Sequence, residues 1–245
     1  MNQRVKAQIK GGKLLAKIKQ ELIDSIKPGI KLEHIDKQAE DLLRKTGGTP
    51  SFQMVPGYSW STCINLNQGI VHGIPKGSIK SGDLVTLDIG LFYQGYHTDT
   101  SSSFFVGPTT PKNKKFLDTG KKVLAKSISV AKANNRVFDI SEKIQQGIES
   151  AGYSVVRNLT GHGVGEQLHQ DPAIPCFTQG SRSNSPILSA DQAIAIEVMY
   201  CMGDWHTKIE ADGWTISTQD EKLSAIFEET IIITNNKPII ATSIS

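Results

Sequence analysis

The chain has 245 residues, of which 38% are hydrophobic and 21% charged, and its formal net charge is +3. This composition is ordinary for a soluble globular protein; no run of about 18 apolar residues is present, which excludes a transmembrane helix, and residues 1–10 lack the apolar stretch of a signal peptide. Three cysteines, Cys63, Cys176 and Cys201, lack metal-type spacing and fit free thiols in a reducing cytoplasm.

Two amphipathic helices are predicted at the start of the chain. The first spans residues 4–26 and ends at Pro28-Gly29, and the second spans about 33–45 and closes at Gly47-Gly48. Residues 1–45 hold eleven Lys and Arg against six Asp and Glu. This basic surplus is typical of a solvated helix face, and it also leaves open a contact with an anionic partner such as ribosomal RNA.

Loop and strand signals follow these helices. Glycine, proline and serine are frequent in residues 47–60, which predicts a loop. Short apolar runs predict the next strands, and Tyr93-Gln94-Gly95 is the expected hairpin turn between two of them. The predicted strands of this part span residues 63–66, 69–72, 84–90 and 96–105.

The second half of the chain repeats the order of helices and strands. Helices are predicted over 112–134 and about 139–150, with Asp139 as N-cap and Gly152 as the stop of the second. This succession predicts an α+β fold in a single domain over residues 1–245, although no internal repeat can be aligned. Strands are expected near residues 153–157, 193–201, 206–210 and 224–233, with a turn at 235–236 into 238–242.

Four carboxylates and one histidine lie inside segments that have the pattern of buried strands or tight turns. They are Asp88, Asp99, His162, Glu197 and Glu228. A single buried acid is usually paired with an arginine or a backbone donor, because burying an uncompensated charge is costly. Four carboxylates together balance the charge of two divalent cations. The pattern therefore favours a two-metal hydrolytic site.

The neighbours of two of these acids are small. Side chains alternate between the faces of a strand, so Asp88 shares its face with Thr86 and Gly90. By the same rule Glu197 shares its face with Ala193 and Ala195. Small neighbours leave room on this face of the sheet for ions and a substrate.

Seven short blocks of the sequence, three of which contain Asp88, Asp99 and His162, carry a family resemblance. At these blocks the chain resembles the type I methionine aminopeptidases of the pita-bread fold. The resemblance implies an antiparallel sheet backed by helices, with halves related by a pseudo-twofold axis. The span from Glu197 to Glu228 is too short for the subdomain that type II members carry. The blocks are Cys63-Ile64-Asn65-Leu66-Asn67, Val71-His72-Gly73-Ile74-Pro75, Asp88-Ile89-Gly90, Asp99-Thr100-Ser101, Gly161-His162-Gly163-Val164-Gly165, Asp212-Gly213-Trp214 and Leu223-Ser224-Ala225.

The resemblance implies a role for each predicted ligand. Asp88 would chelate one ion with both oxygens, Asp99 and Glu228 would bridge the two ions, and His162 and Glu197 would complete the shell of the other. Oxygen-rich ligation with one imidazole and no thiolate suits Mn²⁺, Fe²⁺ or Co²⁺, with Zn²⁺ also open, and differs from a structural zinc site. The sequence does not choose among these ions.

Three residues are candidate catalytic groups in the implied mechanism. A hydroxide bridging the metals would attack the scissile carbonyl, and Glu197 would move the proton of the water to the leaving amine. His169 would donate a hydrogen bond to the developing oxyanion, and His72 would contact the scissile amide. Without the family resemblance, His72 and His169 would be interpreted as ordinary core or surface histidines. His97 lies two residues before Asp99, so on an extended strand the two side chains share one face. His97 could therefore support a metal ligand through a hydrogen bond, or it could be a surface histidine.

Apolar and aromatic side chains are expected to bind the first side chain of the substrate, because such walls suit a flexible thioether. The chain also departs from the family pattern at two positions beside ligands. Val198 stands where proline is common, and Glu229 stands where histidine is common. Glu229 should point away from Glu228 on a regular strand. The expected pocket residues are Phe52, Val55, Tyr58, Cys63, Leu168 and Trp214.

These expectations combine into one functional hypothesis. The chain is predicted to be a cytoplasmic, monomeric, metal-dependent methionine aminopeptidase that removes the initiator methionine from nascent polypeptides. Its partners would be peptide substrates and, through the basic N-terminal helix, the ribosome, but no membrane. Two alternatives stay open: an Xaa-Pro-type exopeptidase, and a non-catalytic pita-bread protein that binds peptides or nucleic acid.

Overall fold

The computed structural model describes residues 2–244. Its helices are α1 (Gln3–Ser25), α2 (Leu32–Lys45), α3 (Pro111–Val130) and α4 (Val137–Glu149), with short 3₁₀ turns at Phe52–Met54 and Arg182–Asn184. The strands of its first half are β1 (Thr49–Pro50), β2 (Thr62–Leu66), β3 (Gly69–Val71), β4 (Leu84–Tyr93) and β5 (Tyr96–Phe105). The strands of its second half are β6 (Ser154–Val155), β7 (Thr160–Gly163), β8 (Gln170–Pro175), β9 (Ala193–Cys201), β10 (Thr207–Ile209), β11 (Ile216–Thr218), β12 (Ser224–Ile232) and β13 (Ile239–Ile240).

One large sheet organises the molecule. Its strand order is β1-β4-β5-β12-β9-β7-β8, with β2 added at β4, β13 at β12 and β6 at β9. The pairings in this sheet are antiparallel. A small second sheet has the order β10-β11-β3. The predicted α+β class with a large antiparallel sheet is confirmed.

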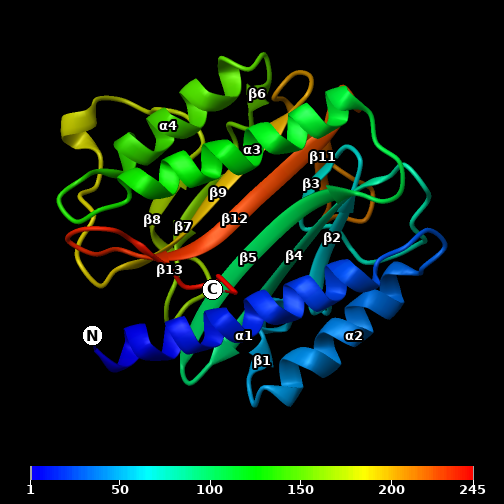
Figure 1. Cartoon of the computed structure of the whole chain (residues 1–245), viewed down its shortest axis with the longest axis horizontal. Coiled ribbons are helices and arrows are strands. Elements are labelled where there is room, and N and C mark those ends of the chain that lie inside the picture. The colour runs from blue at the N-terminus through cyan, green and yellow to red at the C-terminus, as the bar shows by residue number, and fades with distance from the viewer. Residues whose placement is uncertain (1, 245) are drawn as a thin grey trace.

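The helices pack on one face of the large sheet (Figure 1). α1 and α2 lie over the half that contains β4, and their buried leucines and isoleucines form a core with Leu87 and Ile89. α3 and α4 lie over the half that contains β9, where Phe116 and Ile140 pack with Ile196. The two helix pairs give the halves a similar arrangement. Because the helices bury the apolar side chains of this face, the opposite face of the sheet is free to carry polar side chains.

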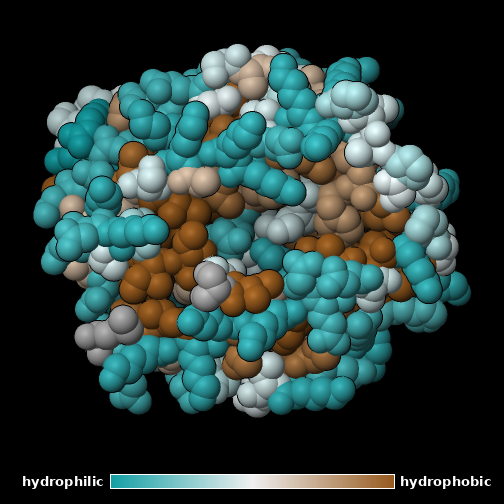
Figure 2. Space-filling model, viewed as in Figure 1, coloured by the Kyte–Doolittle hydropathy of each residue, from teal (hydrophilic) through white to brown (hydrophobic). Residues whose placement is uncertain are grey.

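A groove separates the two helix pairs on the helical side. Apolar side chains gather between α1 and α3, where this face is hollowed (Figure 2). A cavity of about 740 Å³ lies along α3 and the segment 235–240, and Glu229 lies on its floor. Among the described residues, the helices lack the combination of length and apolar character that crossing a bilayer would require.

Local sequence signals explain the start of α1 and the turn between β4 and β5. The side chain of Asn2 accepts a hydrogen bond from the backbone N of Val5 at 2.9 Å, which caps the start of α1. The hairpin between β4 and β5 turns at Gln94 and Gly95, which have φ angles of 52° and 90°. Two consecutive left-handed residues match the twist of paired strands, so the predicted hairpin is confirmed.

The structure corrects several expected boundaries. Asp139 is not the N-cap of α4 but lies in its first turn, where its carboxylate accepts from the backbone N of Arg136 at 2.9 Å. α3 ends at Val130 instead of residue 134, because the side chain of Asn135 caps the Val130 carbonyl at 2.7 Å. The predicted loop at 47–60 contains the short β1 and a 3₁₀ turn, and β7, β8 and β11 were not predicted.

Candidate metal centre

The five predicted ligands come from five strands that are neighbours in the sheet. Asp88 lies on β4, Asp99 on β5, Glu228 on β12, Glu197 on β9 and His162 on β7. These strands follow one another in the order β4-β5-β12-β9-β7. Each strand therefore contributes one side chain to a row that crosses the middle of the sheet.

The register of the pairings brings these side chains to one face. Glu228 is paired opposite Ser101 on one side and opposite Glu197 on the other. Asp88 is also paired with Ser101, and Asp99 lies two residues before it on the same strand. Directly paired residues point to the same face, as do residues two apart. The row thus lies on the face opposite the helices.

The side chains of the row converge closely. Asp99, His162 and Glu228 each place one ligand atom within 4.8 Å of the others, and all three residues are buried. His162 Nε2 lies 3.5 Å from Glu197 Oε1. His162 Nδ1 lies 2.9 Å from the carbonyl oxygen of Gly163, which fixes the proton on Nδ1 and leaves the Nε2 lone pair facing the carboxylates.

No lysine or arginine forms an ion pair with this cluster among the described residues, and the charge of Lys19 acts on it only from a longer distance. Among residues 2–244, no Lys or Arg nitrogen lies within 4.0 Å of the four carboxylates. The buried oxygens Asp88 Oδ1 and Glu228 Oε1 have no hydrogen-bond partner. Burial raises the pKa of Asp99 to about 7, and burial together with the charge of Asp99 raises the pKa of Glu197. Unpartnered oxygen atoms, a strong excess of negative charge and one imidazole fit divalent cations.

A cavity of about 510 Å³ opens above this row. Its upper walls hold the eight residues that the sequence singled out for contact with a substrate. The structure therefore brings the predicted pocket residues and the predicted ligands into one site. The eight are Phe52, Val55, Tyr58, Cys63, His72, Leu168, His169 and Trp214.

Aromatic packing holds the apolar wall together. The ring of Tyr58 meets the ring of Trp214 edge to face, with centroids 5.1 Å apart, and meets the ring of Phe52 at 6.4 Å. The Tyr58 hydroxyl lies 2.8 Å from the carbonyl oxygen of Thr62 and 3.1 Å from that of Gly73. Tyr58 thereby ties the wall to the turn that carries His72. The φ angle of His72 is 57°, a strained value for a non-glycine residue that is typical of functional positions.

The remaining histidines take different positions. His169 lies on the exposed side of the cavity, and its ring centroid is 4.5 Å from that of His162. His97 is buried, so the surface alternative for it is wrong; its Nδ1 lies 2.8 Å from the Ser51 hydroxyl. His97 is not among the residues that line the cavity. His34 and His206 are exposed and are not among the residues that line the cavity.

Several cavity residues were missed by sequence reasoning. Met199 is two residues after Glu197 on β9, so the alternation of side chains would have found it. Val71 precedes His72 in a quoted block without having been assigned a role. The segment before His162 carries no signal for a site in the sequence, because its strand is short and polar. The missed residues are Val71, Asn158, Leu159, Thr160 and Met199.

Comparison with known proteins identifies the family. Residues 7–235 match Metallopeptidase family M24. The chain belongs to metallopeptidase family M24. Within this M24 family it is 39% identical to the methionine aminopeptidase of Clostridium perfringens over 96% of this chain and 94% of that protein. It is 40% identical to methionine aminopeptidase 1 of Bacillus subtilis over 91% of this chain and 90% of that protein. The predicted resemblance to the methionine aminopeptidases is confirmed.

Solved structures agree with this assignment. The crystal structure of methionine aminopeptidase from Thermotoga maritima superposes on this M24 chain with a TM-score of 0.95, at 35% identity and with 99% of this chain covered. Prolidase from Pyrococcus furiosus superposes with a TM-score of 0.78 at 20% identity, and that likeness shows the shared fold alone. The predicted pita-bread fold is thereby confirmed.

Proposed function

We propose that this chain is a metal-dependent aminopeptidase that removes N-terminal methionine from peptides and nascent proteins. The observation that supports this most directly is the row of four carboxylates and His162 at the base of a cavity with apolar walls. A cavity of about 510 Å³ has the size of a site for a small ligand, and its lining combines apolar side chains with a few polar groups. The methionine aminopeptidases that the chain resembles support the choice of substrate.

The row would hold two divalent cations. Asp88, Asp99, His162, Glu197 and Glu228 would be the ligands, with Mn²⁺, Fe²⁺ or Co²⁺ as the proposed ions and Zn²⁺ as a further choice. When bound, such ions polarise a carbonyl and acidify a water, which is the chemistry that amide hydrolysis needs. The buried, unpartnered oxygens of Asp88 and Glu228 support this assignment.

The protein groups would orient the peptide and move the proton. Glu197 would accept the proton of the attacking water and deliver it to the leaving amine. His169 would donate a hydrogen bond to the carbonyl oxygen as negative charge develops there. Burial lowers the pKa of His72, so its ring is neutral near pH 7 and offers one N–H to the scissile amide.

The apolar wall would select the first side chain. Phe52, Tyr58 and Leu168 pack around Cys63 in a cluster that Trp214 completes. An unbranched thioether can fill such an irregular apolar space and contact the aromatic rings. Burial raises the pKa of the Cys63 thiol, so Cys63 acts as a small neutral wall residue rather than as a nucleophile.

Hydrolysis of Met-Ala-Ser tests the proposal. Turnover should require Mn²⁺ or Co²⁺, cease after chelation with EDTA and return when the ion is restored. An Xaa-Pro dipeptide cleaved faster than Met-Ala-Ser would instead favour a Pro-directed exopeptidase. Absence of metal-dependent turnover on either substrate would favour a non-catalytic binding protein.

We further propose that residues 1–245 act as a single catalytic domain, as a monomer in the cytoplasm. The three cysteines are free and buried, which suits a reducing compartment. Sedimentation analysis should give the mass of one chain. Co-sedimentation with ribosomes at low and high salt would test the contact proposed for the basic α1, since a contact with RNA weakens as salt rises.

A further inference from the structure

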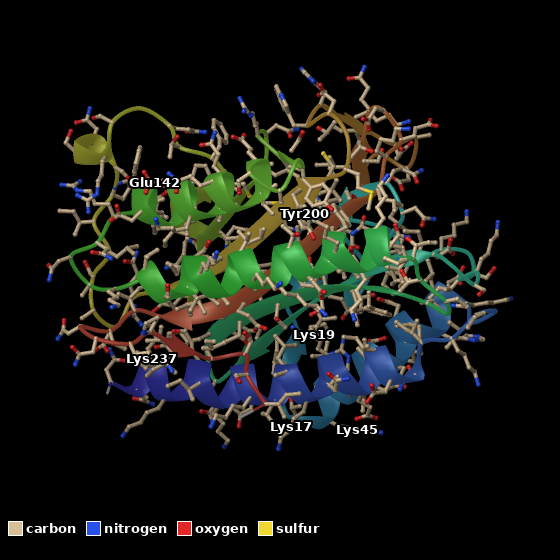
Figure 3. The ribbon with its side chains drawn as sticks, turned by 45° about the horizontal axis from the view of Figure 1, so that its top comes forward. Lys17, Lys19, Lys45, Glu142, Tyr200 and Lys237 are labelled. Atoms are coloured by element: carbon tan, nitrogen blue, oxygen red, sulfur yellow. The ribbon has the colours of Figure 1, made fainter. Side chains whose placement is uncertain are left out.

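A second set of polar side chains lies directly behind the proposed metal centre. Thr100 follows Asp99 on β5, and Glu229 follows Glu228 on β12. Thr100 and Glu229 are paired opposite each other in the sheet. Because neighbouring residues on a strand point to opposite faces, both side chains point toward the helices. Figure 3 shows Lys19 reaching from α1 toward this part of the sheet, whereas Lys17 lies on the outer side of the helix.

These side chains form one network. Lys19 Nζ donates to Thr100 Oγ1 at 2.6 Å and lies 3.7 Å from Glu229 Oε1. Thr100 Oγ1 in turn lies 2.9 Å from the carbonyl oxygen of Glu228 and 3.2 Å from Glu229 Oε2. The hydroxyl of Thr242 also donates to Glu229 Oε2. The network therefore contacts the backbone of Glu228, a predicted ligand, and includes Thr100, which is the residue after the predicted ligand Asp99.

The burial of the network makes it more than a surface ion pair. The side chain of Lys19 is 10% exposed. The side chain of Glu229 is 23% exposed and lines the cavity beside α3. Exposed pairs contribute little, but a mostly buried charge needs its partner. Lys19 can meet its partner only if α1, β5 and β12 keep one relative position. The same relative position sets the spacing of Asp99 and Glu228 on the other face.

We propose that Lys19, Thr100 and Glu229 are positioning residues that hold Asp99 and Glu228 at the spacing required to bind two cations. They touch neither the substrate nor the ions, and they act through the backbone of β5 and β12. This inference also gives a physical reason for a glutamate at position 229, where histidine is common in the family, because this carboxylate has Lys19 on α1 as its partner. The positioning role depends on the proposed metal centre, and the experiment below can disprove either one without the other.

The test is the affinity for Mn²⁺, measured by isothermal titration calorimetry on the full chain. Lys19→Met, Glu229→Gln and Thr100→Val should each weaken Mn²⁺ binding by about 10- to 100-fold, which is the usual effect of losing a group that orients metal ligands. Lys17→Met is the matched control, because it removes the same charge from the exposed side of α1 and should leave the affinity within twofold of the wild type.

The signs of these effects exclude a simple effect of charge. If Lys19 and Glu229 acted only through long-range electrostatics, Lys19→Met would tighten cation binding and Glu229→Gln would weaken it. Positioning predicts that both weaken it, and that the double variant loses no more than the worse single variant. Thr100→Val changes no charge and preserves the shape of the side chain, so it decides the matter if Lys19→Met fails to fold.

Two results would overturn parts of the scheme separately. A wild-type protein that does not bind Mn²⁺ would remove the proposed metal centre itself. A wild type that binds Mn²⁺, together with a Thr100→Val variant that binds it equally well, would overturn the positioning role alone. A lower melting temperature with unchanged Mn²⁺ affinity would show that the network only stabilises the fold.

Discussion

Replacing Asp99 by asparagine should change the stability of the metal-free protein and its response to metal in opposite directions. Burial raises the pKa of Asp99 from 3.8 to about 7. Between these two values the folded state binds more protons than the unfolded state, so the stability of the metal-free protein falls as the pH rises through this window. Relative to strongly acidic pH, this shift lowers the stability by about 4 kcal/mol at pH 7.5 and by about 2 kcal/mol at pH 5, where Asp99 of the folded state is still protonated.

The Asp99→Asn variant lacks this titration, and its side-chain oxygen can still accept the hydrogen bond from the backbone N of Thr100. In EDTA, the stability of the variant relative to the wild type should therefore rise by about 2 kcal/mol between pH 5 and pH 7.5. With Mn²⁺ at about 100 times its Kd, the wild type should gain about 2.7 kcal/mol, and the variant should gain far less because a proposed metal ligand has lost its charge.

Urea denaturation at both pH values, with and without Mn²⁺, measures these quantities. The slope of the unfolding free energy against urea should be the same for both proteins, so that the comparison reflects stability alone. Asp24→Asn, which removes an exposed carboxylate from α1, is the control and should show neither effect. A stability difference between Asp99→Asn and the wild type that does not change with pH would refute the reasoning.

Three further changes test other parts of the site. His169→Ala should lower kcat on Met-Ala-Ser by about 10²–10³-fold with metal content retained, since it removes one donor to the oxyanion; loss of metal would contradict this role. Trp214→Ala should lower kcat/KM for Met-Ala-Ser by about 10- to 100-fold more than for a peptide with a small first residue, because the lost wall contacts the longer side chain; an equal loss on both peptides would indicate misfolding. Gly161→Ala should weaken Mn²⁺ binding in calorimetry, because the added Cβ would lie 2.5 Å from the carbonyl oxygen of Ala195 and push β7 away from β9; unchanged binding would show that the strand accommodates it.

Much of the fold follows from local patterns in the sequence. The long helices were predicted because their apolar residues repeat with the helical period over several turns, as in α1, which was predicted at 4–26 and spans Gln3–Ser25. β7 and β8 were not predicted, because their sequences lack a local pattern typical of strands. Thr160–Gly163 contains two glycines and Gln170–Pro175 contains two prolines, so these segments become strands only through pairing in the sheet.

The site was predictable in a different way. Alternation along a strand correctly gave the face that Asp88 and Glu197 share with their small neighbours. It could not give the order β4-β5-β12-β9-β7, which alone brings five distant residues into one row. The grouping of these five residues into one site was predicted from the family resemblance. The partner of Glu229 was not predicted. The helical period does place Lys19 inward, four residues after Leu15 and three before Leu22, but it does not show which residue of the sheet that lysine meets.

The central pairing of β5 with β12 has a consequence for the order of events during folding. Thr100 and the Glu228 carbonyl meet although they are 128 residues apart in the chain. Closing so long a loop is slow and entropically costly, so this contact forms after the local hairpin of β4 and β5. Asp88 and Asp99 are therefore adjacent early, while Glu228 arrives only when the two halves dock. Tight cation capture consequently marks a completed fold and cannot guide the chain toward it.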